Sequence, residues 1–155
     1  MSSSLALIGL GSNLGDREAT LKGAIAALGA TPGVVVRSVS SFHETEPIGG
    51  PAGQGMFLNA AAALETTLDP LELLKILQAI EARFGRMRTV HWGERTLDLD
   101  LLLFGDQIID TPELSVPHPR FTTRRFVLEP LAEVAPTAVD PVTKRTIAEL
   151  LRELT

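Results

Sequence analysis

The chain contains no cysteine, which excludes disulfide bonds and thiolate-bound metal sites. Its three histidines are scattered, so the sequence also argues against zinc. No apolar run approaches the roughly 18 residues that a membrane-spanning helix needs. Residues 1–10 lack the basic start of a signal peptide. We therefore expect a cytoplasmic protein that has no membrane partner.

Positive charge is also scarce overall, since the formal net charge is −5, which argues against a nucleic-acid partner. Half of the 14 basic residues nevertheless fall within residues 83–95 and 120–125. Such a local cationic patch on an acidic protein suits a small polyanion better than a long one. The 155 residues are enough for one domain with a hydrophobic core, and we expect a single domain over 1–155 that acts as a monomer.

Hydrophobic periodicity and capping residues predict the order β-α-β-β-α-β, followed by a C-terminal extension. This order predicts an α+β fold with a ferredoxin-like antiparallel sheet, two helices on one face and the other face partly free for a site. The expected strands are 5–10, 34–43, 57–64 and 97–104, the expected helices are 16–29 and 69–85, and the extension holds a proline-rich loop at 112–119 and helices near 125–133 and 146–154.

Two aspartates, Asp98 and Asp100, interrupt the apolar strand 97–104 at a spacing of two. Because side chains alternate along a strand, both carboxylates point the same way, roughly 6–7 Å apart. Two anions on one strand face need cations, and Mg²⁺ ions shared with phosphates supply them. The alternative is an ion network in which arginines pair directly with the aspartates. The density of cationic side chains upstream favours a polyphosphate site, and these are Arg83, Arg86, Arg88, His91 and Arg95.

Three other motifs each have a structural explanation beside a functional one. The glycine-rich residues 9–15 lack the spacing of a dinucleotide fingerprint, so we interpret them as a tight turn. Asn59 is either satisfied by neighbouring backbone or presents its amide to a flat heterocycle, and stacking partners such as Trp92 and Phe126 favour the ligand. His118 stands between two prolines and close to three arginines, which favours an aimed side chain over a structural one.

These motifs together resemble 6-hydroxymethyl-7,8-dihydropterin pyrophosphokinase of folate biosynthesis. The resemblance extends over about residues 5–136 and rests on Gly-Ser-Asn-Leu-Gly-Asp (11–16), Phe-Leu-Asn-Ala (57–60), Trp-Gly-Glu-Arg-Thr-Leu-Asp-Leu-Asp (92–100) and Val-Pro-His-Pro-Arg (116–120). The family's ferredoxin-like α+β fold agrees with the predicted strand order. The chain departs from some relatives at His91, Glu113 and Pro119.

The resemblance implies that pyrophosphate passes from ATP to the pterin's hydroxymethyl oxygen and that AMP is released. It implies that Asp98 and Asp100 bind two Mg²⁺ ions, and that Arg86 and Arg95 stabilise charge as the bond to AMP breaks. The residues implied for the ATP site are Gln78, Glu81, Arg88, Trp92, Leu101, Ser115, His118 and Arg124. Those implied for the pterin site are Thr45, Glu46, Pro47, Ile48, Phe57, Asn59, Trp92 and Phe126.

Two other functions are compatible with parts of the pattern. One is a different metal-dependent phosphoryl or nucleotidyl transferase that uses the same carboxylate pair. The other is a ligand sensor without catalysis, in which the aspartates are only ion-paired. A sensor has no need for paired carboxylates beside arginines and an aromatic residue on one sheet face, so the sequence favours the transferase.

Overall fold

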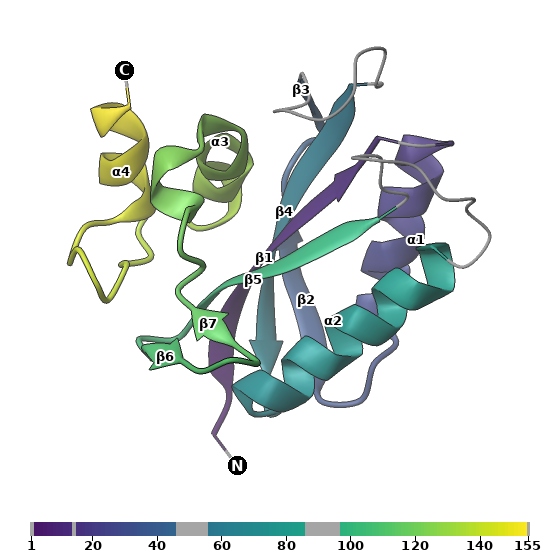
Figure 1. The fold of residues 1–155 in the computed structure, drawn as a ribbon, viewed down its shortest axis with the longest axis horizontal. Helices are drawn as coiled ribbons and strands as arrows, with labels where there is room; N and C mark the ends of the chain where they lie inside the picture. Colours follow the sequence, from purple (N-terminus) through teal and green to yellow (C-terminus); the bar gives the residue numbers. More distant parts are fainter. Residues whose placement is uncertain (1, 14, 46–55, 86–96, 155) are drawn as a thin grey trace.

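The computed structural model describes residues 2–13, 15–45, 56–85 and 97–154. Its main sheet is antiparallel, with strands in the order β2-β4-β1-β5 and a short strand, β3, that also pairs with β4 (Figure 1). The strands are β1 (Ser4–Ser12), β2 (Val34–Val39), β3 (His43–Thr45), β4 (Phe57–Thr66) and β5 (Asp98–Phe104), and β6 (Ile109–Asp110) pairs with β7 (Ser115–Val116). The helices are α1 (Arg17–Gly29), α2 (Pro70–Gly85), the 3-10 helix η1 (Phe121–Thr123), α3 (Arg125–Val134) and α4 (Ile147–Glu153).

Both long helices begin at the predicted capping residues. The side chain of Asp16 accepts a hydrogen bond from the Ala19 backbone N–H at 3.1 Å. Asp69 and Glu72 form a reciprocal capping box, with distances of 2.8 and 2.9 Å between carboxylate oxygens and backbone nitrogens. Because these side chains satisfy the first backbone donors, helix initiation could be predicted from local sequence alone.

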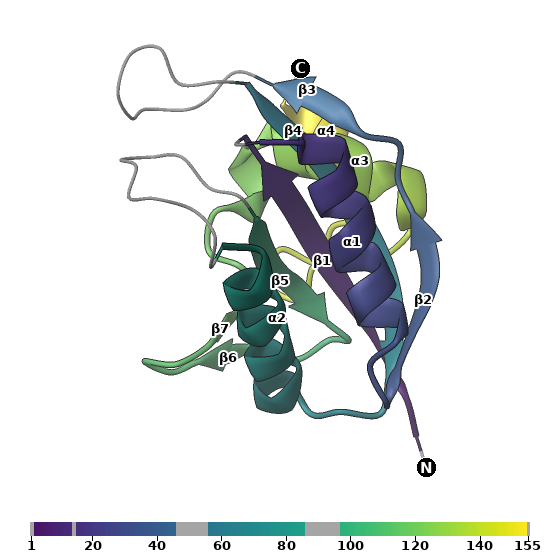
Figure 2. The same ribbon diagram turned by 90° about the vertical axis from the view of Figure 1, so that its right-hand side faces the viewer.

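Helices cover both faces of the sheet (Figures 1 and 2). α1 and α2 pack on one face, as predicted, around buried side chains such as Ile8, Leu73 and Leu77. α3 and α4 of the C-terminal extension pack on the opposite face, against a second cluster that includes Leu7 and Leu128. On this second face a pocket remains beside the start of α3, and it is the candidate site.

Two predicted boundaries are wrong. Residues 34–43 form two strands rather than one, because the ladder changes at Ser40, whose hydroxyl accepts a hydrogen bond from the Ala61 N–H at 2.8 Å. Gly9 and Gly11 lie within β1 and not in a tight turn. The positive φ that is typical of a turn, 72°, occurs at Gly15, which follows the end of β1 at Ser12. The chain therefore turns after the strand and not within it.

None of the helices described here combines the length and the apolar character that crossing a membrane requires.

Candidate active site

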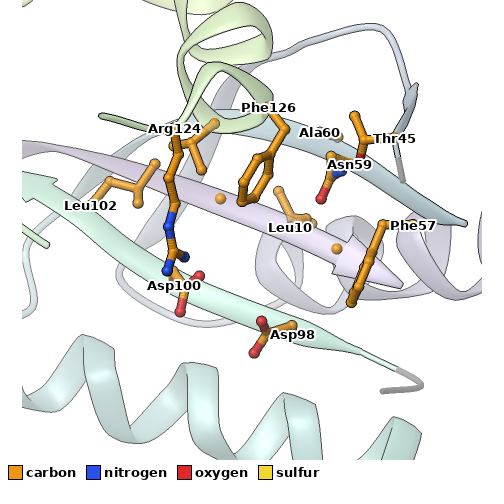
Figure 3. A pocket seen from close by; sticks show the side chains of 13 residues that line it. Leu10, Thr45, Phe57, Asn59, Ala60, Asp98, Asp100, Leu102, Arg124 and Phe126 are labelled. Carbon is orange, nitrogen blue, oxygen red and sulfur yellow. Dashed lines mark hydrogen bonds between the residues drawn. The ribbon is translucent and has the colours of Figure 1, made fainter. Parts of the chain in front are cut away.

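A pocket of about 190 Å³ lies on the α3 side of the sheet, above β1, β4 and β5 (Figure 3). It brings together side chains from five separate elements. The residues that line it are Gly9, Leu10, Gly11, Thr45, Phe57, Asn59, Ala60, Asp98, Asp100, Leu102, Arg124, Phe126 and Val127.

Asp98 and Asp100 both line the pocket and are half-buried. They lie two residues apart on β5 and therefore point to the same face of the sheet, as their spacing predicts. Within the described residues no group of three or more histidine, aspartate or glutamate side chains could enclose a metal ion. Any cation held by this pair therefore needs further ligands from other sources, and Mg²⁺ commonly takes these from water and substrate phosphates.

Gly9 and Gly11 form the floor of the pocket opposite the carboxylates. In the β1–β5 register, Gly11 pairs with Asp98 and Gly9 pairs with Asp100. A Cβ atom at Gly11 would stand 3.0 Å from Oδ1 of Asn59. The two glycines thus leave open the space that side chains would otherwise fill above the strand.

One wall of the pocket is polar and aromatic and is built from β3 and β4. Asn59 is 8% exposed, and its Nδ2 donates a hydrogen bond to Oγ1 of Thr45. Thr45 pairs with Phe57 in the β3–β4 register, so the amide, the hydroxyl and an aromatic ring adjoin one another. Because the amide nitrogen is engaged by Thr45, the amide is oriented with Oδ1 toward Gly11.

The opposite wall comes from the start of α3. The guanidinium carbon of Arg124 lies 5.7 Å from the ring centroid of Phe126, within cation–π range. Figure 3 shows the Arg124 side chain extending from α3 toward the carboxylate of Asp100. The pocket is therefore cationic and anionic at its β5 end, and aromatic and amide-lined at its β3 end.

His118 lies near the carboxylate end without lining the pocket. Burial lowers the pKa of His118, and the charge of Arg124 lowers it further, while Asp98 acts in the opposite direction. Its backbone N–H donates to the Leu102 carbonyl at 2.9 Å, and its Nδ1 accepts from the Arg120 N–H at 3.3 Å. These contacts hold the imidazole beside the strand that carries both aspartates.

Besides His118, four residues predicted for the ATP site lie outside the pocket lining. Gln78 is exposed on α2, and Ser115 is exposed on β7. Glu81 accepts a hydrogen bond from the Leu99 N–H at 2.8 Å and so ties α2 to β5. Leu101 is buried in the core on the α1–α2 face of the sheet.

Other predicted site residues lie outside the described part of the chain, so their positions enter no geometric argument. They are Arg86, Arg88, Trp92 and Arg95 of the ATP and catalytic set, and Glu46, Pro47 and Ile48 of the pterin set.

Six lining residues were not predicted from the sequence: Gly9, Leu10, Gly11, Ala60, Leu102 and Val127. The period-two rule could have identified Leu102, which follows Asp100 on the same strand face. It could equally have identified the two glycines once β1 was extended through Gly11. Nothing in the local sequence indicates Val127, because its place depends on how α3 packs over the sheet.

Comparisons with known proteins agree on one family. Residues 7–136 match the family described as 7,8-dihydro-6-hydroxymethylpterin-pyrophosphokinase. The chain is 52% identical over 130 residues to the 2-amino-4-hydroxy-6-hydroxymethyldihydropteridine pyrophosphokinase of Bacillus subtilis, covering 84% of this chain and 77% of that one. It is 44% identical over 149 residues to the enzyme of the same name from Synechocystis, covering 96% and 75% respectively.

Solved structures agree on the fold. The chain resembles Plasmodium falciparum HPPK-DHPS in complex with pteroate, with a TM-score of 0.76 and 17% sequence identity. The match covers 98% of this chain and 42% of that one, so the present chain spans less than half the length of this structural relative. At this level of identity the likeness concerns the fold alone.

Proposed function

The chain belongs to the 7,8-dihydro-6-hydroxymethylpterin-pyrophosphokinase family, and we propose that the pocket beside α3 is where it transfers pyrophosphate from ATP to 6-hydroxymethyl-7,8-dihydropterin. The products are the pterin diphosphate and AMP, in a step of folate biosynthesis. One observation supports placing the reaction in this pocket: the paired carboxylates and the wall of amide and aromatic side chains line the same space. The former suit a metal-bound triphosphate, and the latter suits a flat heterocycle.

The donor set at Asp98 and Asp100 fits Mg²⁺. Carboxylate oxygens are hard ligands, and two of them leave positions for phosphate oxygens and water. We assign two Mg²⁺ ions to this pair, which would neutralise the triphosphate and the charge that develops on its oxygens. Among the chain's own residues, Arg124 adds a guanidinium toward Asp100, where it can also meet a phosphate (Figure 3).

The pterin fits the other end of the pocket. Oδ1 of Asn59, oriented by the bond from Nδ2 to Thr45, can accept a hydrogen bond from a pterin N–H group. Phe57 and Phe126 offer aromatic surfaces from β4 and α3 for the ring. The remaining pterin-site residues of this proposal, taken over from the family resemblance, are Glu46, Pro47, Ile48 and Trp92.

The reaction then joins the two ends of the pocket. The hydroxymethyl oxygen attacks the β-phosphorus of ATP, the bond between that phosphorus and the AMP oxygen breaks with its electrons left on that oxygen, and the hydroxyl proton passes to water. Arg86 and Arg95 are proposed to stabilise the departing charge. The ATP contacts proposed from the family resemblance are Gln78, Glu81, Arg88, Trp92, Leu101, Ser115, His118 and Arg124.

The fold is proposed to be of the ferredoxin-like class. The four long strands β1, β2, β4 and β5 lie in the order β2-β4-β1-β5 and are antiparallel, which supports this assignment. Both helical layers pack against the same sheet, which supports a single domain over residues 1–155.

The proposed function predicts that AMP forms from ATP only when the pterin is also present. Incubating the protein with ATP and Mg²⁺, with and without 6-hydroxymethyl-7,8-dihydropterin, and quantifying AMP by chromatography tests this. A ligand sensor would bind nucleotide and release no AMP in either sample. ADP as the product would indicate a different phosphoryl transferase.

Gly11→Ala is expected to raise the KM for the pterin about tenfold, because the new Cβ displaces the Asn59 amide from its place. That Cβ would lie 3.0 Å from Oδ1 of Asn59, closer than side chains normally tolerate. The matched control is Gly29→Ala, where the added Cβ meets only Val36 Cγ2 at 3.9 Å. Steady-state kinetics at saturating ATP measures the effect. Equal pterin KM values for Gly11→Ala and Gly29→Ala would argue against the role given to Asn59.

A further inference from the structure

We propose that Glu133 is a positioning residue for the pterin end of the pocket, because it joins β3 to α3, the two elements that carry Thr45 and Phe126. The proposal rests on the proposed function, since it concerns how that same pocket holds its acceptor substrate. Glu133 lies outside the pocket lining and acts through its partners.

Glu133 binds the segment that leads into β3 through several groups at once. Its Oε1 accepts from the backbone N–H of Ser41 at 2.7 Å, and both carboxylate oxygens accept from the Ser41 hydroxyl at 2.9 Å. Its Oε2 also contacts Nε2 of His43 at 2.5 Å. One carboxylate on α3 therefore holds two residues of the β2–β3 segment; we call this set, Ser41, His43 and Glu133, the β3–α3 clamp.

The β3–α3 clamp is placed to control the polar wall of the pocket. β3 has only three residues, and His43 and Thr45 share a face because side chains alternate. His43 pairs with Asn59 in the β3–β4 register, and Asn59 in turn donates to Thr45. A shift of His43 is therefore passed directly to the two polar groups that we assign to pterin recognition.

The same contact fixes the other wall. Glu133 and Phe126 belong to the same helix, α3, and Phe126 lies near its start. Phe126 lies about two turns before Glu133 on this helix, with Pro130 between them, so holding Glu133 against β3 limits how far the start of α3 can move from Thr45 and Asn59. The width of the proposed pterin space between β3 and α3 then depends on the contacts of Glu133, which lie outside the pocket.

The clamp combines the residue types of a hydrolytic triad, yet its geometry does not support nucleophilic chemistry. In such a triad the serine gives its proton to one imidazole nitrogen while the carboxylate holds the other. Here the Ser41 hydroxyl donates to Glu133, and the same Nε2 of His43 meets both Ser41 and Glu133. The arrangement holds two elements together and leaves no activated serine oxygen.

The surroundings of Glu133 favour the charged form of its carboxylate. The backbone N–H of Ser41 lowers the pKa of Glu133, and the His43 and Ser41 side chains lower it further, against a smaller opposing effect of burial. A charged acceptor makes stronger hydrogen bonds than a neutral amide, so glutamine is a weaker replacement. We therefore expect Glu133→Ala to have a larger effect on the pterin KM than Glu133→Gln.

β3 is also held from the opposite face of the sheet, which provides a comparison. Arg17 on α1 donates to the Met56 carbonyl at 2.8 Å and forms a 3.4 Å ion pair with Glu44. This contact fixes the end of β3 and the start of β4 without involving α3. Loss of Arg17 should thus loosen β3 itself while leaving the β3–α3 clamp in place.

The test measures pterin KM, kcat and the dissociation constant of an ATP analogue with Mg²⁺ for wild type, Glu133→Ala and Glu133→Gln. We expect Glu133→Ala to raise the pterin KM about tenfold, Glu133→Gln to raise it less, and both to keep kcat and analogue affinity within about twofold of wild type. The matched control is Glu129→Gln, one turn earlier on α3, whose carboxylate pairs only at 3.6 Å with Arg125.

Each outcome has one meaning. An unchanged pterin KM for Glu133→Ala would overturn the proposal, whether or not the variant melts at a lower temperature. An equal rise in pterin KM for Glu129→Gln would also overturn it, because the effect would then not depend on the clamp. If wild type itself makes no pterin-dependent AMP, the proposed function fails, which is distinct from failure of this inference.

Discussion

Alanine at Asp98 or Asp100 is expected to lower the rate of pyrophosphate transfer by at least about 10³-fold while the protein remains folded. Each carboxylate is half-buried at the pocket, facing a glycine of β1 rather than a hydrophobic core. Removing one therefore opens no apolar cavity. The activity is lost because one carboxylate cannot hold the cations that the triphosphate requires.

The measurement combines single-turnover AMP formation with a thermal melt of each variant. Asp106→Asn is the matched control, because Asp106 is exposed in the turn immediately after β5. Mg²⁺ titration adds a second readout: the variants should need far more Mg²⁺ to bind an ATP analogue. If the aspartates only formed an ion network, the variants would lose thermal stability and keep Mg²⁺-dependent turnover, and that result would disprove the metal assignment.

The shared face of Asp98 and Asp100 could be predicted because it follows from local geometry. A strand has a period of two, so residues spaced by two must point to the same side whatever surrounds them. The same rule places Phe57 and Asn59 together on β4. Helix starts at Asp16 and Asp69 were equally local, since each depends on a side chain three residues from its partner.

What the sequence could not predict depends on contacts between distant segments. Glu133 is one more acidic residue on an amphipathic helix, and its partner Ser41 lies 92 positions away in the chain. The split of residues 34–43 into two strands likewise depends on Ser40 meeting Ala61 across the sheet. Periodicity carries no information on such pairings, because they are decided by how the elements pack.

The glycines of β1 illustrate an error of interpretation rather than of information. Residues 9–15 lack the spacing of a dinucleotide fingerprint, and the sequence therefore predicts a tight turn there. In the structure Gly9 and Gly11 stand in register with Asp100 and Asp98, and both line the pocket without adding a side chain to it. A glycine pair at a spacing of two inside a strand predicts an open strip on one sheet face, which is the stronger inference here.

Arg95→Ala is expected to lower kcat about 10²- to 10³-fold, which is the usual cost of removing one group that stabilises developing charge. Arg95 stands three residues before Asp98 in the sequence and lies outside the described residues. Its proposed role is to meet the charge that grows on the departing AMP oxygen as the β-phosphorus is transferred. Such a group binds the transition state more strongly than it binds ATP, so nucleotide affinity should change much less than rate.

Measuring the dissociation constant of an ATP analogue and the single-turnover rate on the same variant separates catalysis from binding. Arg152→Ala is the matched control, because Arg152 is an exposed arginine in the last turn of α4, outside the predicted cationic cluster, and its loss changes the net charge by the same amount. A large affinity loss with an unchanged rate would make Arg95 a binding residue only. A ligand sensor has no chemical step to slow, so it would show that pattern for every cationic residue near the pocket. A transferase must instead contain at least one residue whose removal lowers the rate more than it lowers the affinity.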